Sequence, residues 1–594
     1  MKKVALGIFY LALSCILFSD SVAHIGVKSL KLPNLNTIDF QAKPANPKMH
    51  STISRVLQAY KEGGLKGAAS FWKSWNMTMK DGKIRVILEI NPTTINKGIE
   101  TVKSLGGTVE STCNNFVQIL CPLSSLESLS SVPEINYIRQ SYFFKPDTMS
   151  EGIPAVGATA WHEKGYHGQG VKVAIVDAGF QGYEELLGTE LPVSVTARSF
   201  REDGDITGEE EVHGTACAEI VHDMAPQSQL YLINFATDVE FSNAIDYLIS
   251  EGVHIISHSI GWFNTGPGDG TGKICRIVDK AKAAGIVWVN SAGNNATMHW
   301  EGEFIDELGD NWHEFDPSIN NEGNAILTLE EFPIVVLLRW DDWPVSDQDY
   351  DLYVFDESGE TIIASSTNIQ NGTQAPMEEI ICPAPYTGFY FIAIHKKEAT
   401  RDVYFDLYTP YQDLIYGYFV TESSLSQPAD SPNALAVGAT YWLDDSLEYF
   451  SSQGPTDGDN PRIKPDLTAP DGVSTEAYGP ADPDWWMGFF GTSASCPHVA
   501  GAAALLKSWD PTQTPDQIKS YLQSHAFDLG DPGKDNLFGY GRLDLAAGPP
   551  ERPCEGNFDS DNDVDGTDLA LFTADLSRTD LSLFAADFGR SDCP

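Results

Sequence analysis

The chain contains 594 residues, which is too long for a single hydrophobic core and predicts about three to five compact units. Its composition is ordinary for a globular protein, with 42% hydrophobic and 11% aromatic residues. Its charge is unusual, because 83 acidic residues oppose 38 lysines and arginines and give a formal net charge of −45. This balance argues against nucleic-acid binding, which needs a basic surface, and suits an extracellular protein that binds Ca²⁺ or lives in salt.

The N-terminus has the features of an export signal. Lys2 and Lys3 precede the apolar run VALGIFYLALSCILF, and the small residues of SDSVA suit cleavage near Ala23. The run is short for a membrane span, and no later segment is apolar and long enough to be one. We therefore expect residues 1–23 to be a signal peptide and the protein to be secreted, with no membrane span. Export also permits disulfides, for which Cys554 with Cys593 and Cys113 with Cys121 are candidate pairs.

Residues 24–150 comprise a leader and a small domain. KIRVILEI reads as a strand, NKGIETVKSLGG as a helix with a glycine stop, TVESTCNNFVQILCP as paired strands, LSSLESLSSVPEI as a second helix and NYIRQ as a last strand. This β-α-β-β-α-β order predicts a ferredoxin-like unit.

Strands and helices alternate from residue 151 to 296 and again from 431 to 549, beginning with the buried strand VKVAIVDAGF. Such alternation predicts an α/β domain with a doubly wound parallel sheet. The intervening residues 297–430 contain strand-like runs separated by turn signals, which predicts an inserted all-β sandwich.

The tail at 550–594 is short, acidic and internally repeated, with TDLALFTADLSR followed by TDLSLFAADFGR. A twelve-residue loop precedes the first predicted helix and has the oxygen spacing of an EF-hand, although Asn562 replaces the usual glycine. This spacing predicts one Ca²⁺, since the second repeat lacks most ligands; a plain acidic tail is the alternative. The predicted ligands are Asn557, Asp559, Asp561, Asp563, Asp565 and Asp568.

Three residue types suited to nucleophilic catalysis occur at ends of predicted elements. Asp177 ends a buried strand, His213 begins a helix in HGTACAE, and Ser493 begins another in GTSASCPHVAG. A serine needs a base to remove its proton, and the histidine needs an acid to orient it. A serine at a helix N-terminus also lies in a positive local field that favours an oxyanion, and Asn294 ends another strand and could supply a second donor.

These motifs resemble the subtilisin-like serine proteases (subtilases). The matching segments occur in the family order and cover about 151–296 and 431–549: VAIVDAGF, HGTACAEIVHDMAP, SHSIG, VNSAGNNA, VGATYW, KPDLTAP and GTSASCPHVAGAAALL. The resemblance implies Asp177 as orienter, His213 as general base and Ser493 as nucleophile, with Asn294 and the Ser493 N–H forming the oxyanion hole. It implies no cofactor for catalysis. The segment Ser259–Gly261 would line the substrate channel as an edge strand, pairing with an extended peptide. The expected substrate-binding residues are Ser259, Ile260, Gly261, Trp262, Ala292 and Gly293.

The chain departs from the family pattern at three positions. Ala178 replaces a threonine or serine whose hydroxyl could support the Asp177 carboxylate, Ala494 stands where methionine is common, and Trp262 stands where glycine is often found. His498 matches a motif histidine with a structural role. Cys217, one helical turn after His213, and Cys496 are either two buried thiols or a disulfide or mercurial-sensitive pair.

The flanking regions resemble further modules. The unit at about 80–140 is similar to the inhibitory prosegment of the family, which would make it a partner of its own enzyme; a retained N-terminal domain is the alternative. The inserted module resembles the β-sandwiches of bacterial secreted peptidases. It carries a loop that could hold Ca²⁺ or form a solvated acidic face, with Asp341, Asp342, Asp347, Asp349 and Asp351. The tail resembles half of a type I dockerin, which implies a cohesin-like partner.

Together these features predict a secreted serine endopeptidase that is made as a precursor and acts on protein or peptide substrates. The alternative is a catalytically weak subtilase-fold scaffold that serves in binding or adhesion. Only Ala178 favours this second hypothesis.

Overall fold

The structure is a computed structural model that describes residues 46, 48–49, 51–73, 79–80, 83–113, 115–139, 150–208, 211–415, 417–482, 487–550, 556–559, 561, 563–575, 584–585 and 588–589. The predicted signal peptide and the Cys554–Cys593 pair lie outside these residues. The chain divides into two compact units, Met1–Lys145 and Pro146–Pro594. Every helix in the described ranges is too short or too polar to cross a bilayer.

The first unit has the predicted β-α-β-β-α-β order. Its sheet is antiparallel, with the strand order β1-β2-β4-β3 and β5 paired to β2. Alternate residues of β2 are buried, which gives this strand one face toward the core. The elements are α2 (Ser51–Lys73), β1 (Met79–Lys80), β2 (Lys83–Ile90), α3 (Ile95–Ser104), β3 (Thr108–Cys113), β4 (Phe116–Pro122), α4 (Leu126–Ser130) and β5 (Ile135–Arg139).

The predicted Cys113–Cys121 disulfide is wrong. Cys121 is a free, buried thiol. The register of the β3–β4 hairpin pairs Cys113 with Phe116, near the turn, whereas Cys121 lies near the far end of β4. The sequence proximity of the two cysteines therefore does not bring them opposite each other.

The α/β domain of the second unit contains the predicted parallel sheet, in the order β20-β19-β10-β9-β6-β8-β7. Its elements are α5 (Gly152–Ala155), α6 (Thr159–His162), β6 (Lys172–Asp177), β7 (Thr196–Ser199), α7 (His213–Met224), β8 (Gln229–Asn234), α8 (Asp238–Ser250), β9 (Ile255–His258), α9 (Lys273–Ala283), β10 (Val287–Ser291), β19 (Ala434–Tyr441), β20 (Leu467–Asp471), α10 (Thr492–Trp509) and α11 (Pro515–His525).

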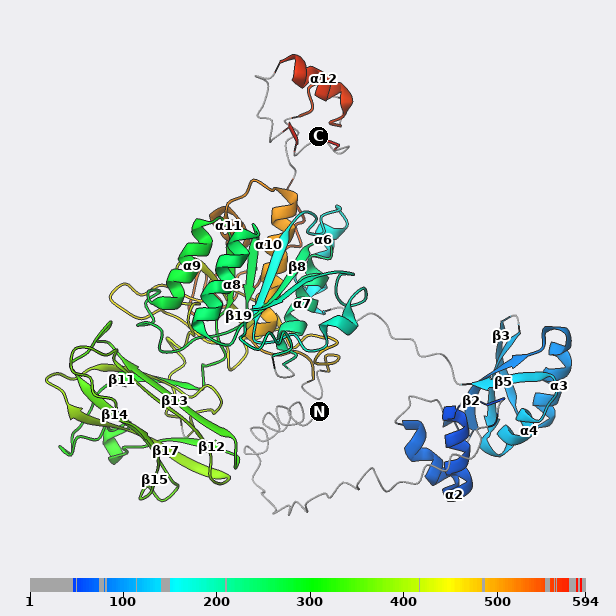
Figure 1. Cartoon of the computed structure of the whole chain (residues 1–594), viewed down its shortest axis with the longest axis horizontal. Helices are drawn as coiled ribbons and strands as arrows, with labels where there is room; N and C mark the ends of the chain where they lie inside the picture. The colour runs from blue at the N-terminus through cyan, green and yellow to red at the C-terminus, as the bar shows by residue number, and fades with distance from the viewer. Residues whose placement is uncertain are drawn as a thin grey trace. The chain divides into compact units, whose positions relative to one another are not determined.

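Helices cover both faces of this sheet, which explains why its strands are continuous apolar runs. Val173 and Ile175 of β6 point toward α7 and α10, whereas Ala174 and Val176 point toward α8 and α9. The helices α8 and α9 lie side by side on their face (Figure 1). This arrangement gathers the carboxyl ends of the parallel strands at one edge of the sheet, where doubly wound folds bind their ligands.

The inserted module is a sandwich of two antiparallel sheets, β11-β18-β13-β16 and β12-β17-β14-β15 (Figure 1). The two sheets enclose a separate apolar core that includes Leu338, Tyr350 and Phe405. Its strands are β11 (His299–Glu303), β12 (Asn324–Thr328), β13 (Pro333–Trp340), β14 (Asp349–Phe355), β15 (Ile362–Ser366), β16 (Met377–Pro383), β17 (Gly388–Glu398) and β18 (Tyr404–Tyr408).

The outer face of the β11-β18-β13-β16 sheet contacts the α/β domain. The Phe263 ring lies 5.1 Å from the Tyr408 ring, between centroids, and packs with Val335 and Leu337. The Arg339 guanidinium, which is almost fully buried, reaches across to the Asp457 carboxylate at 2.7 Å. The sandwich is therefore held to the α/β domain by both apolar and ionic contacts.

Candidate active site

Asp177 and His213 meet at the carboxyl end of β6, an interior strand of the parallel sheet. Both carboxylate oxygens of Asp177 lie 2.9 Å from Nδ1 of His213, which is the first residue of α7. The Asp177 side chain is completely buried, whereas the His213 side chain keeps 23% of its surface exposed. The arrangement fixes the imidazole with Nδ1 toward the carboxylate and leaves Nε2 for a second partner.

The environment of His213 shifts its pKa upward. Burial lowers the pKa of this ring, but the negative charge of Asp177, its hydrogen bond to Nδ1 and the charge of Glu211 together raise it by more. The imidazolium form is thus stabilised next to Asp177, as a general base needs once it has accepted a proton.

The Asp177 carboxylate is supported without the hydroxyl that Ala178 lacks. The backbone N–H of Ala178 donates to Oδ1 of Asp177 at 2.8 Å. The close approach of α7 also depends on Gly214, because a Cβ there would lie 2.8 Å from the Asp177 Cβ and 2.6 Å from the Gly179 carbonyl oxygen. The main chain therefore supplies one hydrogen bond to this carboxylate.

Ser493 lies in the first turn of α10 and is partly exposed. Its hydroxyl donates to the Ser259 carbonyl oxygen at 3.3 Å, and the Ser259 hydroxyl donates to the Ser493 carbonyl oxygen at 3.1 Å. Ser493 and His213 both belong to the described residues, and they form no direct hydrogen bond there. The thiol of Cys217, one turn after His213, lies 3.6 Å from the Ser493 carbonyl oxygen, so the first turns of α7 and α10 are in contact.

Asn294 is held beside the first turn of α10 by Thr492. Its Oδ1 accepts hydrogen bonds from the Thr492 backbone N–H at 3.0 Å and from the Thr492 hydroxyl at 2.9 Å. Because an N–H group can only donate, these contacts identify the oxygen of the Asn294 amide and leave its Nδ2 as a donor. The Ser493 N–H is in the first turn of a helix, where no intrahelical acceptor exists. Sequence reasoning missed the role of Thr492, although its place in the Gly-Thr-Ser motif was a signal.

The expected substrate-binding residues lie in two segments, 259–262 and 292–293. The strand β9 ends at His258, so the segment 259–261 is not the predicted edge strand; it leaves the centre of the sheet, between β10 and β6. Trp262 instead forms a short antiparallel bridge with Gln427.

A Cβ added to Gly261 would lie 2.3 Å from the Ser426 hydroxyl, and one added to Gly293 would lie 2.9 Å from it. Ser426, which the sequence did not single out, therefore lies between these two segments. Ala292 is buried on the same side, and its carbonyl oxygen accepts from the Ser426 N–H at 3.1 Å.

Trp262 packs away from open solvent. Its ring stacks on Phe235 at 5.7 Å between centroids and contacts Phe241 at 5.3 Å, while Ile260 packs against the same apolar cluster. The large side chain of Trp262, at a position where the family often has glycine, therefore contributes to the packing of α8 against the sheet.

The remaining motif residues have structural contacts. His498 is buried, donates from Nδ1 to the Ala494 carbonyl oxygen and accepts at Nε2 from the Ser150 hydroxyl, each at 2.8 Å. Burial lowers its pKa to about 4, which keeps the ring neutral. Cys217 and Cys496 are free and buried, so they are two separate thiols and not a disulfide. Burial raises the pKa of both thiols.

The tail brings its predicted carboxylates together around the start of α12 (Gly566–Ala574). Side-chain oxygens of Asp559, Asp561 and Asp568 lie within 4.8 Å of one another, and so do those of Asp563, Asp565 and Asp568. Asp568 is fully buried and accepts backbone N–H bonds from Phe558 at 2.6 Å and from Asp565 at 3.0 Å. Asn557 is the first residue of this loop. An all-oxygen donor set of this kind fits Ca²⁺.

The acidic loop of the sandwich does not form a comparable cluster among the described residues. Asp341 and Asp342 each pair with Arg401, at 3.1 and 3.3 Å. Asp351 is buried and accepts from the Tyr353 hydroxyl, and Asp349 is buried as well. Asp347 contacts Gln348. The loop is neither a gathered cation site nor a wholly solvated face.

Comparison with known proteins identifies the α/β domain. The model of the subtilase family matches residues 168–324 and 417–541. Subtilisin BL of Lederbergia lenta is 37% identical over 125 residues, which cover 21% of this chain and 41% of that protein. The minor extracellular protease Vpr of Bacillus subtilis (strain 168) is 23% identical over 519 residues, covering 73% of this chain and 60% of that protein.

Among solved structures, the CspB protease of Clostridium perfringens matches with a TM-score of 0.48 and 16% identity, over 66% of this chain and 97% of that one. The chain spans less than two thirds of the length of the two curated relatives. The matched segments flank the sandwich strands β13 to β18, so the match follows the α/β domain across its insertion. The α/β domain of the chain is therefore similar to the subtilase family in both of its segments.

Proposed function

We propose that this protein is a secreted serine endopeptidase that cleaves peptide bonds through an acyl-enzyme on Ser493. The observation that carries the proposal is the paired contact of His213 with both oxygens of the buried Asp177, next to the helix turn that bears Ser493. The match to the subtilase family and the name of the relative Vpr, an extracellular protease, support the same activity and location.

The reaction begins when Ser493 transfers its hydroxyl proton to Nε2 of His213. The hydroxyl now donates to the Ser259 carbonyl, so a rotation about the Cα–Cβ bond has to turn it toward the imidazole. The serine oxygen attacks the peptide carbonyl carbon, and the carbonyl oxygen becomes an anion. Asn294 Nδ2 and the Ser493 N–H would donate to that anion, while Asp177 stabilises the imidazolium.

Collapse of this intermediate breaks the C–N bond as His213 returns the proton to the leaving amine. The first product departs and leaves an ester on Ser493. Water then loses a proton to His213 and attacks the ester, which releases the second product and restores the serine hydroxyl. Residues 259–262 and 292–293 would bind the extended substrate, with Ser426 between them.

We further propose that the first unit is an autoinhibitory prosegment. Its ferredoxin-like fold is a separate compact unit, which is what a removable segment requires. N-terminal sequencing and the intact mass of the secreted protein test this: a mature N-terminus after residue 139 supports removal, and a secreted active form that keeps residues 46–139 identifies a retained domain.

For the tail, we propose one bound Ca²⁺ and a cohesin-like protein as partner. The gathered carboxylates of Asp559, Asp561 and Asp568 support the cation, because such close negative charges repel each other unless a cation lies between them. The partner rests on the resemblance of the repeat to half a dockerin, and a pull-down with a type I cohesin tests it.

Fluorophosphonate labelling tests the peptidase activity. The wild-type protein should be labelled on Ser493 and should hydrolyse casein, and Ser493→Ala should lose both properties while unfolding at the same temperature. A folded wild-type protein that takes no label would instead favour the scaffold hypothesis.

A further inference from the structure

We propose that His299, Glu301 and Asp406 form a binding site for one divalent cation, Zn²⁺ or a similar transition-metal ion, where the sandwich faces the α/β domain. The site is separate from the proposed active site. Glu301 and Asp406 line a cavity whose described lining residues include neither Asp177, His213 nor Ser493.

The strand register creates a like-charge pair that needs a counter-ion. The strands β11 and β18 are antiparallel, and Glu301 stands directly opposite Asp406. His299 is two residues before Glu301 and therefore points to the same face of the sheet. Two carboxylates placed opposite each other across strands destabilise a sheet. A cation between them would reverse the sign of that interaction.

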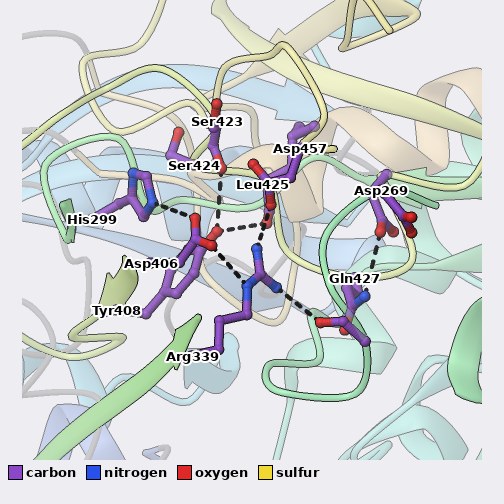
Figure 2. A network of polar contacts seen from close by, with 12 residues as sticks. Asp269, His299, Arg339, Asp406, Tyr408, Ser423, Ser424, Leu425, Gln427 and Asp457 are labelled. Atoms are coloured by element: carbon purple, nitrogen blue, oxygen red, sulfur yellow. Dashed lines mark hydrogen bonds and ion pairs between the residues drawn. The ribbon is translucent and has the colours of Figure 1, made fainter. Parts of the chain in front are cut away.

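Arg339 forms an ion pair with only one carboxylate oxygen of Asp406, Oδ2. It stands opposite Asp406 on the next strand, β13, and donates from Nε to Oδ2 of Asp406 at 3.2 Å. Glu301 has no strand on its other side, because β11 is the edge strand of its sheet, and it shares hydrogen bonds with the uncharged hydroxyls of Ser423 and Tyr404. The Arg339 guanidinium is further shared with Asp457, at 2.7 Å (Figure 2).

The charges around this face leave a deficit of positive charge. One guanidinium faces three carboxylates, those of Glu301, Asp406 and Asp457. Two basic residues line the same cavity: Lys273, which pairs with Asp238, and Arg276, which is exposed.

His299 is oriented as a metal ligand would be. The ring is completely buried, and its Nδ1 donates to the Val420 carbonyl oxygen at 2.8 Å. In the neutral ring this leaves a lone pair on Nε2, which lies 3.5 Å from Oδ1 of Asp406. Figure 2 shows the imidazole and this carboxylate facing each other. A second hydrogen bond that fixes the tautomer in this way is usual for metal-bound histidines.

The spacing of the donor atoms fits a metal ion. The ligand atoms of His299, Glu301 and Asp406 all lie within 4.8 Å of one another. Two ligands on a tetrahedral Zn²⁺ are about 3.4 Å apart, given bond lengths near 2.1 Å. One imidazole with two carboxylates favours a transition-metal ion over Ca²⁺, which prefers oxygen ligands.

The cavity above the cluster gives the cation access and room for water ligands. It has a volume of about 960 Å³ and is lined by Glu301 and Asp406, by aromatic residues of the sandwich such as Trp340 and Tyr404, and by the loop 265–272 of the α/β domain. The cation would neutralise the face on which the two bodies contact each other. We therefore expect it to stabilise their association.

The test uses the full chain with Ser493→Ala, to prevent autolysis, stripped with EDTA and kept in millimolar Ca²⁺ so that the tail loop is filled. Isothermal titration with Zn²⁺ is compared in this protein, in Glu301→Gln and in Asp459→Asn, which removes an acid from the same cavity outside the cluster. We expect one Zn²⁺ per chain, at least a tenfold weaker affinity in Glu301→Gln and an unchanged affinity in Asp459→Asn.

Two further measurements use the unmodified cluster, so they do not depend on how Glu301→Gln folds. The Co²⁺-loaded protein should show the visible absorption of a histidine-ligated site, and Zn²⁺ should raise the melting temperature. Absence of Zn²⁺ binding, or equal Zn²⁺ affinity in a folded Glu301→Gln, overturns the proposal.

Discussion

The amide oxygen of Asn294 accepts hydrogen bonds from both the backbone N–H and the hydroxyl of Thr492. These two bonds allow only one orientation of the amide and leave Nδ2 free to donate. The Thr492 hydroxyl also accepts from the Gly293 N–H at 3.2 Å, so one side chain connects the loop after β10 with the first turn of α10. The geometry of the proposed oxyanion hole therefore depends on the buried side chain of Thr492.

This relationship gives the first prediction. Asn294→Ala should lower kcat by about 10²- to 10³-fold, the range for losing one oxyanion donor, with little change in KM. Thr492→Val should lower kcat less, by about tenfold, because the backbone N–H of residue 492 still holds the amide. Steady-state kinetics on a peptide anilide measures both. A Thr492→Val enzyme with a raised KM and an unchanged kcat would contradict the positioning role.

The second prediction concerns pH. Burial lowers the pKa of His213, but the Asp177 charge, the Asp177 hydrogen bond and the Glu211 charge together raise it by more, and the base acts only when it is neutral. Activity should therefore fall as the pH drops through this raised pKa, and the acidic limb of kcat/KM should lie above the ordinary histidine value of about 6.5.

Asp177→Asn tests the cause of that shift. Without the carboxylate charge, the acidic limb should move to lower pH, and kcat should fall by about 10⁴-fold through loss of the correct tautomer. A pH profile of residual activity in Asp177→Asn that coincides with the wild-type profile would show that another group sets the limb.

The third prediction follows from the contact between α7 and β6. In Gly214→Ala the new methyl group would lie 2.6 Å from the Gly179 carbonyl oxygen and 2.8 Å from the Asp177 Cβ. We expect a cost of about 1–3 kcal/mol in the free energy of unfolding and a loss of activity, because the helix that begins with His213 has to move. Denaturant unfolding and kcat measure the two effects. Gly566→Ala is the control, since no atom lies within 4 Å of its added methyl group.

The fourth prediction is resistance to peroxide. Ala494, directly after the proposed nucleophile, has no thioether to oxidise. The half-life of activity in dilute H₂O₂ should be longer than that of Ala494→Met, provided that this variant is active before exposure. Equal half-lives would place the sensitive group elsewhere.

The fifth prediction concerns the tail. Full-length Ser493→Ala should bind one Ca²⁺ in the tail by calorimetry, and Asp561→Asn should weaken that binding because it removes one ligand from the gathered carboxylates. Asp575→Asn, beyond the helix, is the charge-matched control and should bind as before. Binding that survives Asp561→Asn unchanged would refute the loop as the Ca²⁺ site.

Much of this architecture was predictable because local patterns report local structure. Apolar runs such as that of β6, followed by glycines and helical periodicity, identified the α/β domain and its interruption by strands. The motif order also identified Asp177, His213 and Ser493 as candidates. Residue spacing gave a wrong prediction for the disulfide between Cys113 and Cys121. The two cysteines are close in sequence, but the strand register of the hairpin does not place them opposite each other.

The sequence by itself determined the element order, the family resemblance and the residue types of the site, since these depend on neighbours along the chain. Tertiary structure alone decided which side chains meet: the two bonds from Thr492 to Asn294, the place of Ser426 between two glycines, and Glu301 opposite Asp406. Such contacts join residues far apart in the chain, and they follow from strand register and helix packing, which one sequence does not record.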